Sequence, residues 1–257
     1  MSASSDALSS RMPPDDKKEL FHTSRNPTGK ETIALLHAFF CSHLEFELVA
    51  PHLSAYHLLL IDLPCHSGSR ASSTAPWTIR ESATRVADVI RAHARDGRAH
   101  VVRVSAGGFV GMQLARQNPE LVLSVFASGC TPFQGYQRWF ATHPRALYPV
   151  VSMQGSWLPE PVYRFATARM GMLPHEELRK ETRVNMSYEL MKDGYADMAN
   201  FTLEEDVLGL ARVGVRTLVL AGTIVDDVKS AGVMGRLLRE NGSCESIAVS
   251  VRGAQHL

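Results

Sequence analysis

Ser105 has the surroundings that nucleophilic chemistry requires. It follows the apolar run 100–104 and precedes Gly107, Gly108 and a helical pattern that ends at Asn118. A serine at a sharp turn between a buried strand and a helix exposes its Oγ, and the helix N-terminus offers N–H groups to a developing oxyanion. An ordinary helix-capping serine is the simpler interpretation, but the double glycine after a buried strand favours the turn.

Candidates for the partners of such a serine lie further along the chain. His256 lies in a Gly-Ala-Gln-His loop after the last apolar run, and Asp226 and Asp227 follow the apolar run before that one. A serine alkoxide needs a base to take its proton and a third group to fix the tautomer of that base. Either aspartate can instead cap the helix that begins near Val228. Asp226 comes first after the loop and is the preferred acid.

The elements that must position these residues alternate between apolar strands and amphipathic helices. The strands are apolar on both faces, which is typical of a parallel sheet covered by helices and predicts the α/β class. Capping-box spacings at Ser42-x-x-Glu45 and Thr78-x-x-Glu81 mark two helix starts. We predict strands over 19–23, 32–36, 56–63, 100–104, 121–127, 215–220 and 246–251, and helices over 44–51, 79–96, 106–118 and 228–239.

This alternation is interrupted once, which predicts the domain organisation. Residues 1–17 mix Ser, Pro, Asp and Lys and are expected to form a disordered leader. Residues 132–206 have helical spacing and no convincing strand, so we expect a helical cap inserted into a core of residues 18–131 and 207–257. Aromatic residues of the cap are candidates for an apolar substrate pocket above Ser105, and its basic residues are expected on a solvated face. The aromatic candidates are Trp139, Phe140, Trp157 and Tyr163, and the basic residues are Arg164, Arg169, Arg179, Lys180 and Arg183.

Composition excludes several classes of function. The chain has 257 residues, is 45% hydrophobic and has a formal charge of +1, which gives no electrostatic preference for nucleic acid. No apolar run approaches the ~18 residues of a membrane span, and no signal peptide is evident, so we expect a cytoplasmic protein without a membrane partner. The four cysteines form no CxxC, and the histidines outside the motifs, His22 and His93 among them, have no paired ligand spacing. We therefore expect neither a metal nor another cofactor.

Five segments in order resemble motifs of the α/β-hydrolase fold family, of the kind with a helical cap. They are His37-Ala38-Phe39, the loop from Asp62 to Ser67, Val104 to Gly108, Leu218 to Gly222 followed by Asp226, and Gly253 to His256. The resemblance implies Ser105 as nucleophile, His256 as base and Asp226 as orienting acid. It also implies an oxyanion hole formed by the backbone N–H groups of Phe39 and Ala106.

The chain departs from this family pattern in four places. Ala38, Cys65 and Arg103 stand where the family usually has glycine. Arg103 can tilt the turn, or it can place its guanidinium by the pocket as an anion contact. The chain also ends one residue after His256, without the helix that usually follows, so we expect apolar sheet surface open to a partner chain in a homodimer.

The function expected from these residues is that of a cofactor-independent serine hydrolase. It would act on an ester, lactone or thioester of an apolar small molecule, through an acyl-enzyme. One alternative keeps the three residues but cleaves an activated carbon–carbon bond. The other is a weakly active or non-catalytic protein that uses the same pocket to bind a ligand, because fold alone does not determine function.

Overall fold

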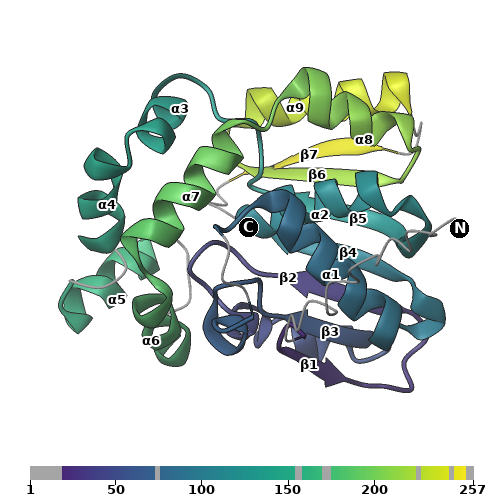
Figure 1. The fold of residues 1–257 in the computed structure, drawn as a ribbon, viewed down its shortest axis with the longest axis horizontal. Helices are drawn as coiled ribbons and strands as arrows, with labels where there is room; N and C mark the ends of the chain where they lie inside the picture. Colours follow the sequence, from purple (N-terminus) through teal and green to yellow (C-terminus); the bar gives the residue numbers. More distant parts are fainter. Residues whose placement is uncertain are drawn as a thin grey trace, which may run out of the picture.

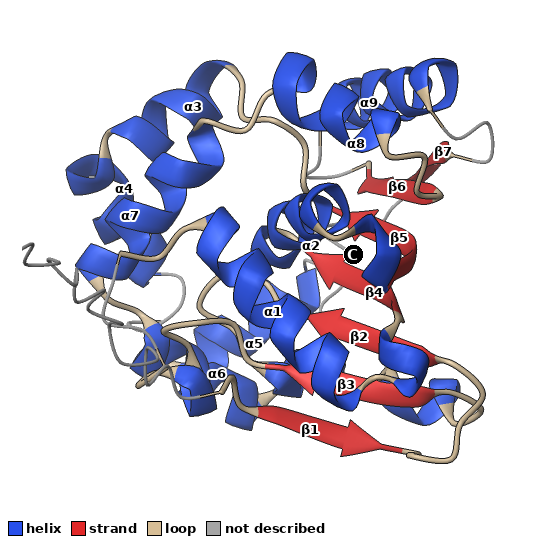
Figure 2. Cartoon of the chain, turned by 45° about the vertical axis from the view of Figure 1, so that its right-hand side comes forward, coloured by secondary structure: helices blue, strands red, loops and turns tan. Residues whose placement is uncertain are grey.

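A seven-stranded sheet forms the centre of the molecule in a computed structural model that describes residues 19–72, 76–153, 158–169, 175–223, 227–242 and 246–252 (Figure 1). The strand order is β1-β3-β2-β4-β5-β6-β7, and β1 and β7 lie at opposite edges (Figure 2). β1 runs antiparallel to β3, and every other neighbouring pair is parallel. The strands are β1 (His22–Arg25), β2 (Thr32–Leu36), β3 (His57–Ile61), β4 (Ala99–Val104), β5 (Val122–Ser128), β6 (Thr217–Gly222) and β7 (Ile247–Val251).

Four helices cover one face of this sheet and bury the main hydrophobic core. They are α1 (Ile79–His93), α2 (Ala106–Gln117), α8 (Leu208–Arg212) and α9 (Val228–Asn241). Thr78 caps α1 as predicted, because its hydroxyl accepts a hydrogen bond from the Glu81 N–H at 3.1 Å. The α/β class and the mostly parallel sheet are therefore as the sequence predicts.

Two short 3₁₀ helices cover part of the opposite face, where the sequence predicts a regular helix over 44–51. They are η1 (His43–Phe46) and η2 (Ala50–Leu53). Ser42 caps η1, but the predicted capping box is wrong, since the Glu45 carboxylate instead accepts a hydrogen bond from the Ala38 N–H at 2.7 Å. Glu45, the second residue of the motif, thus bonds to a residue outside the helix.

Five α-helices in the described part of 132–206 lie together at one end of the molecule, at left in Figure 1. The helical spacing predicted here is confirmed, and the described residues of this segment contain no strand. The division into cap and core stays a prediction. The helices are α3 (Gly135–Thr142), α4 (Pro144–Ser152), α5 (Glu160–Arg169), α6 (Glu176–Asn185) and α7 (Tyr188–Ala199).

The expectation of a solvated face is wrong for Arg179 of α6. Its side chain is buried, with its guanidinium 3.8 Å from the centroid of the Tyr163 ring. It also pairs with Glu160 and donates to the Leu158 carbonyl oxygen. Helical spacing alone does not show that a neighbouring helix supplies an aromatic face and a carboxylate.

Two expectations concern residues at the ends of the described part. The disordered leader of residues 1–17 lies outside the described residues. At the far edge of the sheet, Ile247 and Val249 of β7 are 44% and 40% exposed. The homodimer stays a prediction.

Among the described helices, none is both long and apolar enough to cross a membrane.

Arg103 lies fully buried between β4 and α2, not at the mouth of a pocket. Its Nη1 donates to the Gly108 carbonyl oxygen, and its stem fills the space beside Gly111, where an added Cβ would lie 2.5 Å from Arg103 Cδ. Neither Nε nor Nη2 has a hydrogen-bond partner among the described residues. Burial lowers the pKa of Arg103 to about 10, because the interior disfavours the charged form. The guanidinium therefore costs stability at neutral pH.

We predict that Arg103→Met stabilises the fold by about 1–3 kcal/mol, because it removes a buried and incompletely paired charge and keeps a flexible chain of similar length. The measurement is thermal unfolding at pH 7. Arg116→Met is the matched control, since Arg116 of α2 pairs with Asp206 and its loss should lower Tm. A lower Tm for Arg103→Met would contradict this interpretation and show that the bond to Gly108 outweighs the desolvation of the charge.

Candidate active site

Ser105 forms a strained turn between β4 and α2. Its backbone has φ 51° and ψ −117°, a left-handed conformation that non-glycine residues rarely adopt and that costs about 1–3 kcal/mol. The Ser105 N–H donates to the Ser128 carbonyl oxygen at 2.9 Å, which fixes the turn to the end of β5. The serine is half-buried at the N-terminus of α2. Arg103 does not prevent this turn.

The two glycines after the serine allow α2 to begin unusually close to the sheet. A Cβ on Gly107 would lie 2.3 Å from the Leu36 carbonyl oxygen, and a Cβ on Gly108 would lie 2.3 Å from the Cβ of Cys130. In place of a side chain, the Gly107 N–H donates to the His37 carbonyl oxygen at 3.2 Å. The turn at Ser105 and the end of β2 are therefore joined directly.

Two buried histidines hold the loop after β2 against the loop after β3. The Leu63 N–H donates to Nε2 of His37 at 2.9 Å, and the Phe40 N–H donates to Nε2 of His66 at 3.1 Å. His66 Nδ1 in turn donates to the Pro64 carbonyl oxygen at 2.8 Å. Burial lowers the pKa of His37 below its ordinary value and that of His66 to about 3, so both rings are neutral acceptors at physiological pH. Both nitrogens of each ring are hydrogen-bonded to backbone groups, so both histidines position backbone.

Asp62 organises the loop that contains Cys65. Its Oδ1 accepts hydrogen bonds from the His43 N–H at 2.7 Å and from His43 Nδ1 at 2.9 Å, and its Oδ2 accepts one from the Gly68 N–H at 3.0 Å. Burial disfavours the Asp62 carboxylate, but the bonds from His43 prevail and hold its pKa below the ordinary value. Cys65 has φ 66°, the conformation that favours the glycine usual at this position in the family.

Asn185, at the end of α6, fastens the inserted helices to both loops. Its amide nitrogen donates to the carbonyl oxygens of Phe40 at 3.0 Å and Cys41 at 2.9 Å, and its amide oxygen accepts from the Ser67 N–H at 2.7 Å. The side chain is buried, so these bonds are shielded from water. The sequence interpretation missed Asn185, because its partners lie more than 110 residues away along the chain.

The Phe39 side chain lies beneath α7. A Cβ on Gly194 would lie 2.2 Å from Phe39 Cζ, so the glycine lets the helix rest on the ring. The ring is enclosed by four other rings, with centroid distances between 4.6 and 5.7 Å. These rings belong to Phe40, His66, Trp77 and Tyr195.

Two backbone N–H groups, one in the loop after β2 and one at the start of α2, can donate hydrogen bonds to a ligand. Within the described residues, neither the Phe39 N–H nor the Ala106 N–H donates to a protein acceptor. Ala106 is the first residue of α2, where the helix leaves its N–H groups unpaired and the helix dipole favours negative charge. These are the two donors that the sequence resemblance implies.

A pocket of about 260 Å³ opens beside Ser105. Phe140 is among its lining residues, whereas Trp139 and Tyr163 are not. Trp139 stacks on His143, and Tyr163 lies against Arg179. Trp157 lies outside the described residues.

The sequence interpretation did not single out Tyr195. Burial raises the pKa of Tyr195 to about 12, so its phenol stays neutral. The lining residues are Ser105, Gly129, Thr131, Phe133, Tyr136, Gln137, Phe140, Leu147, Tyr195 and Asp227.

Asp227 is the N-cap of α9. Its Oδ1 accepts from the Ser230 N–H at 2.9 Å, and its Oδ2 accepts from the Ser230 hydroxyl at 2.6 Å. These bonds lower the pKa of Asp227, because they stabilise its charged form. Of the two adjacent aspartates, Asp227 therefore has the capping role. Asp226 and His256 lie outside the described residues, so their roles stay predictions.

Comparison with known proteins identifies the α/β-hydrolase fold. A family model described as alpha/beta hydrolase fold matches residues 31–201. An AB hydrolase superfamily protein of Gibberella zeae is 42% identical over 116 residues, which are 44% of this chain and 40% of that protein. Lipase 3 of a Moraxella species is 28% identical over 130 residues, which are 51% of this chain and 39% of that protein. The matched segments thus span about two fifths of these curated relatives.

The fold comparison extends over most of the chain. The crystal structure of a hydrolase from Pseudomonas aeruginosa superposes with a TM-score of 0.66 at 19% sequence identity, covering 92% of this chain and 87% of that one. A serine at a strand–helix turn on a mostly parallel sheet, with helices inserted after β5, defines the α/β-hydrolase class. The chain belongs to the α/β-hydrolase fold family.

We predict that Gly194→Ala destabilises the protein by about 1–3 kcal/mol, because the added methyl group overlaps an enclosed Phe39 ring. Helix propensity acts in the opposite direction, since alanine is favoured over glycine by about 1 kcal/mol. Thermal unfolding measures the net result.

Gly232→Ala is the matched control, because Gly232 lies in α9 and an added Cβ would have no atom within 4 Å apart from the adjacent backbone of its own helix. Only the propensity gain applies there, so this variant should have a raised Tm. Equal gains in the two variants would show that α7 does not rest on Phe39 as described.

Proposed function

We propose that this protein is a serine hydrolase that cleaves an ester, lactone or thioester of an apolar small molecule through an acyl-enzyme. The observation that carries the proposal is the strained turn at Ser105, φ 51° and ψ −117°, at the edge of a pocket of about 260 Å³. A strained conformation at such a turn supports a functional assignment, because an ordinary capping serine has no need of it.

The chemistry begins at Ser105 Oγ. In this proposal His256 takes the Oγ proton as the oxygen attacks the substrate carbonyl carbon, and Asp226 orients the imidazole and stabilises its charged form. The tetrahedral oxyanion accepts hydrogen bonds from the Phe39 and Ala106 N–H groups, which have no protein acceptor among the described residues. His256 then gives the proton to the leaving group. In the second half of the reaction His256 takes a proton from water as the water oxygen attacks the acyl carbon, and it returns that proton to Ser105 Oγ as the acid is released.

The pocket supports a small and mainly apolar substrate. Four aromatic rings and Leu147 lie among its lining residues, while Thr131 and Gln137 offer polar contacts. A volume of about 260 Å³ accommodates a short acyl chain or a single ring more readily than a long lipid chain. Lipase 3, to which part of this chain is similar, agrees with ester chemistry but does not define the chain length accepted here.

We predict that a fluorophosphonate probe labels the wild-type protein at neutral pH, and that Ser105→Ala abolishes the labelling, because the probe phosphonylates an activated serine hydroxyl. Gel fluorescence of the labelled protein is the measurement. Ser54→Ala is the matched control, since Ser54 is an exposed serine after η2 and its loss should leave labelling unchanged. p-Nitrophenyl acetate and butyrate should be cleaved faster than p-nitrophenyl palmitate.

The other outcomes separate the alternatives. Absence of labelling in folded wild-type protein would contradict the hydrolase proposal and favour a ligand-binding protein. Labelling at Ser105 without turnover of any ester or thioester would favour hydrolysis of an activated carbon–carbon bond.

A further inference from the structure

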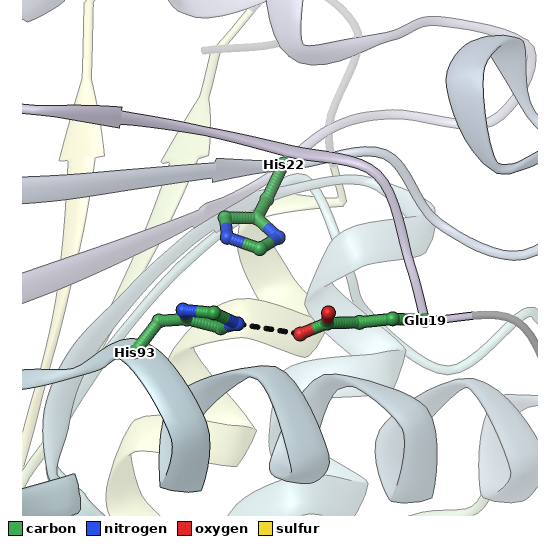
Figure 3. A group of neighbouring side chains, drawn as sticks. All are labelled: Glu19, His22 and His93. Atoms are coloured by element: carbon green, nitrogen blue, oxygen red, sulfur yellow. Dashed lines mark hydrogen bonds and ion pairs between the residues drawn. The ribbon is translucent and has the colours of Figure 1, made fainter.

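Three side chains with metal-binding groups meet at the β1 edge of the sheet (Figure 3). Glu19 precedes β1, His22 is its first residue, and His93 is the last residue of α1. One ligand atom from each side chain lies within 4.8 Å of the others, and the His22 ring lies over the contact between His93 and Glu19. β3 and β2 separate this cluster from β4, at whose end Ser105 lies, so the cluster is distinct from the candidate active site.

The sheet register explains why these residues meet. His22 pairs with Ile61 of β3, and Ile61 belongs to the core beneath α1. Cross-strand partners point to the same face, so the His22 side chain also points to the α1 side. The His22 and His93 rings have centroids 4.3 Å apart. The two histidines are 71 positions apart along the chain, and for this reason ligand spacing in the sequence gave no sign of the cluster.

The hydrogen bonds of the cluster leave a nitrogen lone pair of His22 for a cation. His22 Nδ1 lies 3.2 Å from the Leu20 carbonyl oxygen, which can only accept, so Nδ1 donates and Nε2 keeps its lone pair. A backbone carbonyl that fixes the tautomer in this way is the usual outer partner of a metal-binding histidine. His93 Nε2 lies 2.5 Å from Glu19 Oε1, which accepts the hydrogen bond of the Nε2 proton. A cation between these two atoms takes the place of that proton.

We propose that Glu19, His22 and His93 form a binding site for a divalent transition-metal ion of the Zn²⁺ class. Two imidazoles and one carboxylate suit Zn²⁺, Co²⁺, Ni²⁺ or Cu²⁺, whereas Mg²⁺ and Ca²⁺ prefer oxygen ligands alone. Ligand atoms around tetrahedral Zn²⁺ lie about 3.3 Å apart, given bond lengths of about 2.0–2.1 Å. Small side-chain rotations close the present spacing, since Glu19 and His93 are exposed and their side chains have room to move.

Three protein ligands leave a fourth position for water or for a ligand from another molecule. The ion would join the segment before β1 to the end of α1, two elements far apart in sequence. A bound ion therefore stabilises the antiparallel edge strand by linkage, because the unfolded chain does not bring these residues together.

The test is titration of the metal-stripped full-length chain with Co²⁺, followed by visible absorption, and then displacement of Co²⁺ by Zn²⁺. We expect saturable binding of one ion with the intense absorption of a tetrahedral site, and a raised Tm with Zn²⁺. His22→Gln and His93→Gln should each weaken binding at least tenfold, and Glu19→Gln should weaken it less. His52→Gln, an exposed histidine of η2, is the matched control and should bind as the wild type does.

The proposal is overturned if the His22 and His93 variants bind Co²⁺ and Zn²⁺ as tightly as the wild type, or if the wild-type chain binds neither ion. A Tm increase of equal size with Mg²⁺ would also count against it, because a His₂Glu site does not favour that ion. Fluorophosphonate labelling of the His93→Gln variant should equal that of the wild type. The two proposals can therefore fail independently.

Discussion

The first turn of α2 lies against the ends of β2 and β5, and this close approach determines the geometry of the candidate site. There is no room for a Cβ at Gly107 or Gly108, and the chain enters the helix through Ser105 in a left-handed conformation. The strain at that residue is balanced by hydrogen bonds from Ser105 to β5 and from Gly107 to the end of β2. The Ser105 hydroxyl, the N-terminus of α2 and the loop after β2 therefore lie next to one another.

The loop after β2 is also bonded to side chains from two other segments. His66 accepts from the Phe40 N–H, and Asn185 donates to the Phe40 carbonyl oxygen, so both backbone groups of one residue are fixed by side chains from distant segments. α7 rests on the neighbouring Phe39 ring through Gly194. The helices between β5 and β6 thus contribute residues to the lining of the pocket and also contact Phe39 and Phe40 in the loop after β2.

The sequence predicts those parts of this arrangement that depend on local pattern. Buried strands, the start of α1 at Thr78 and the turn at Ser105 all follow from residues within a few positions of one another. Contacts between distant segments were not predictable in this way. Glu45 turns to Ala38 instead of completing a capping box, Arg179 is buried against Tyr163, and Asn185 bonds to both loops. Their partners lie on other elements, and a single sequence contains no signal for such pairs.

Capture of the covalent intermediate tests the central claim most directly. A p-nitrophenyl ester mixed with the full-length protein and quenched in acid should give, by intact mass spectrometry, a single acyl adduct. Peptide mapping should place the adduct on Ser105, and Ser105→Ala should form none. An adduct on another residue, or turnover by Ser105→Ala at the wild-type rate, would contradict the account.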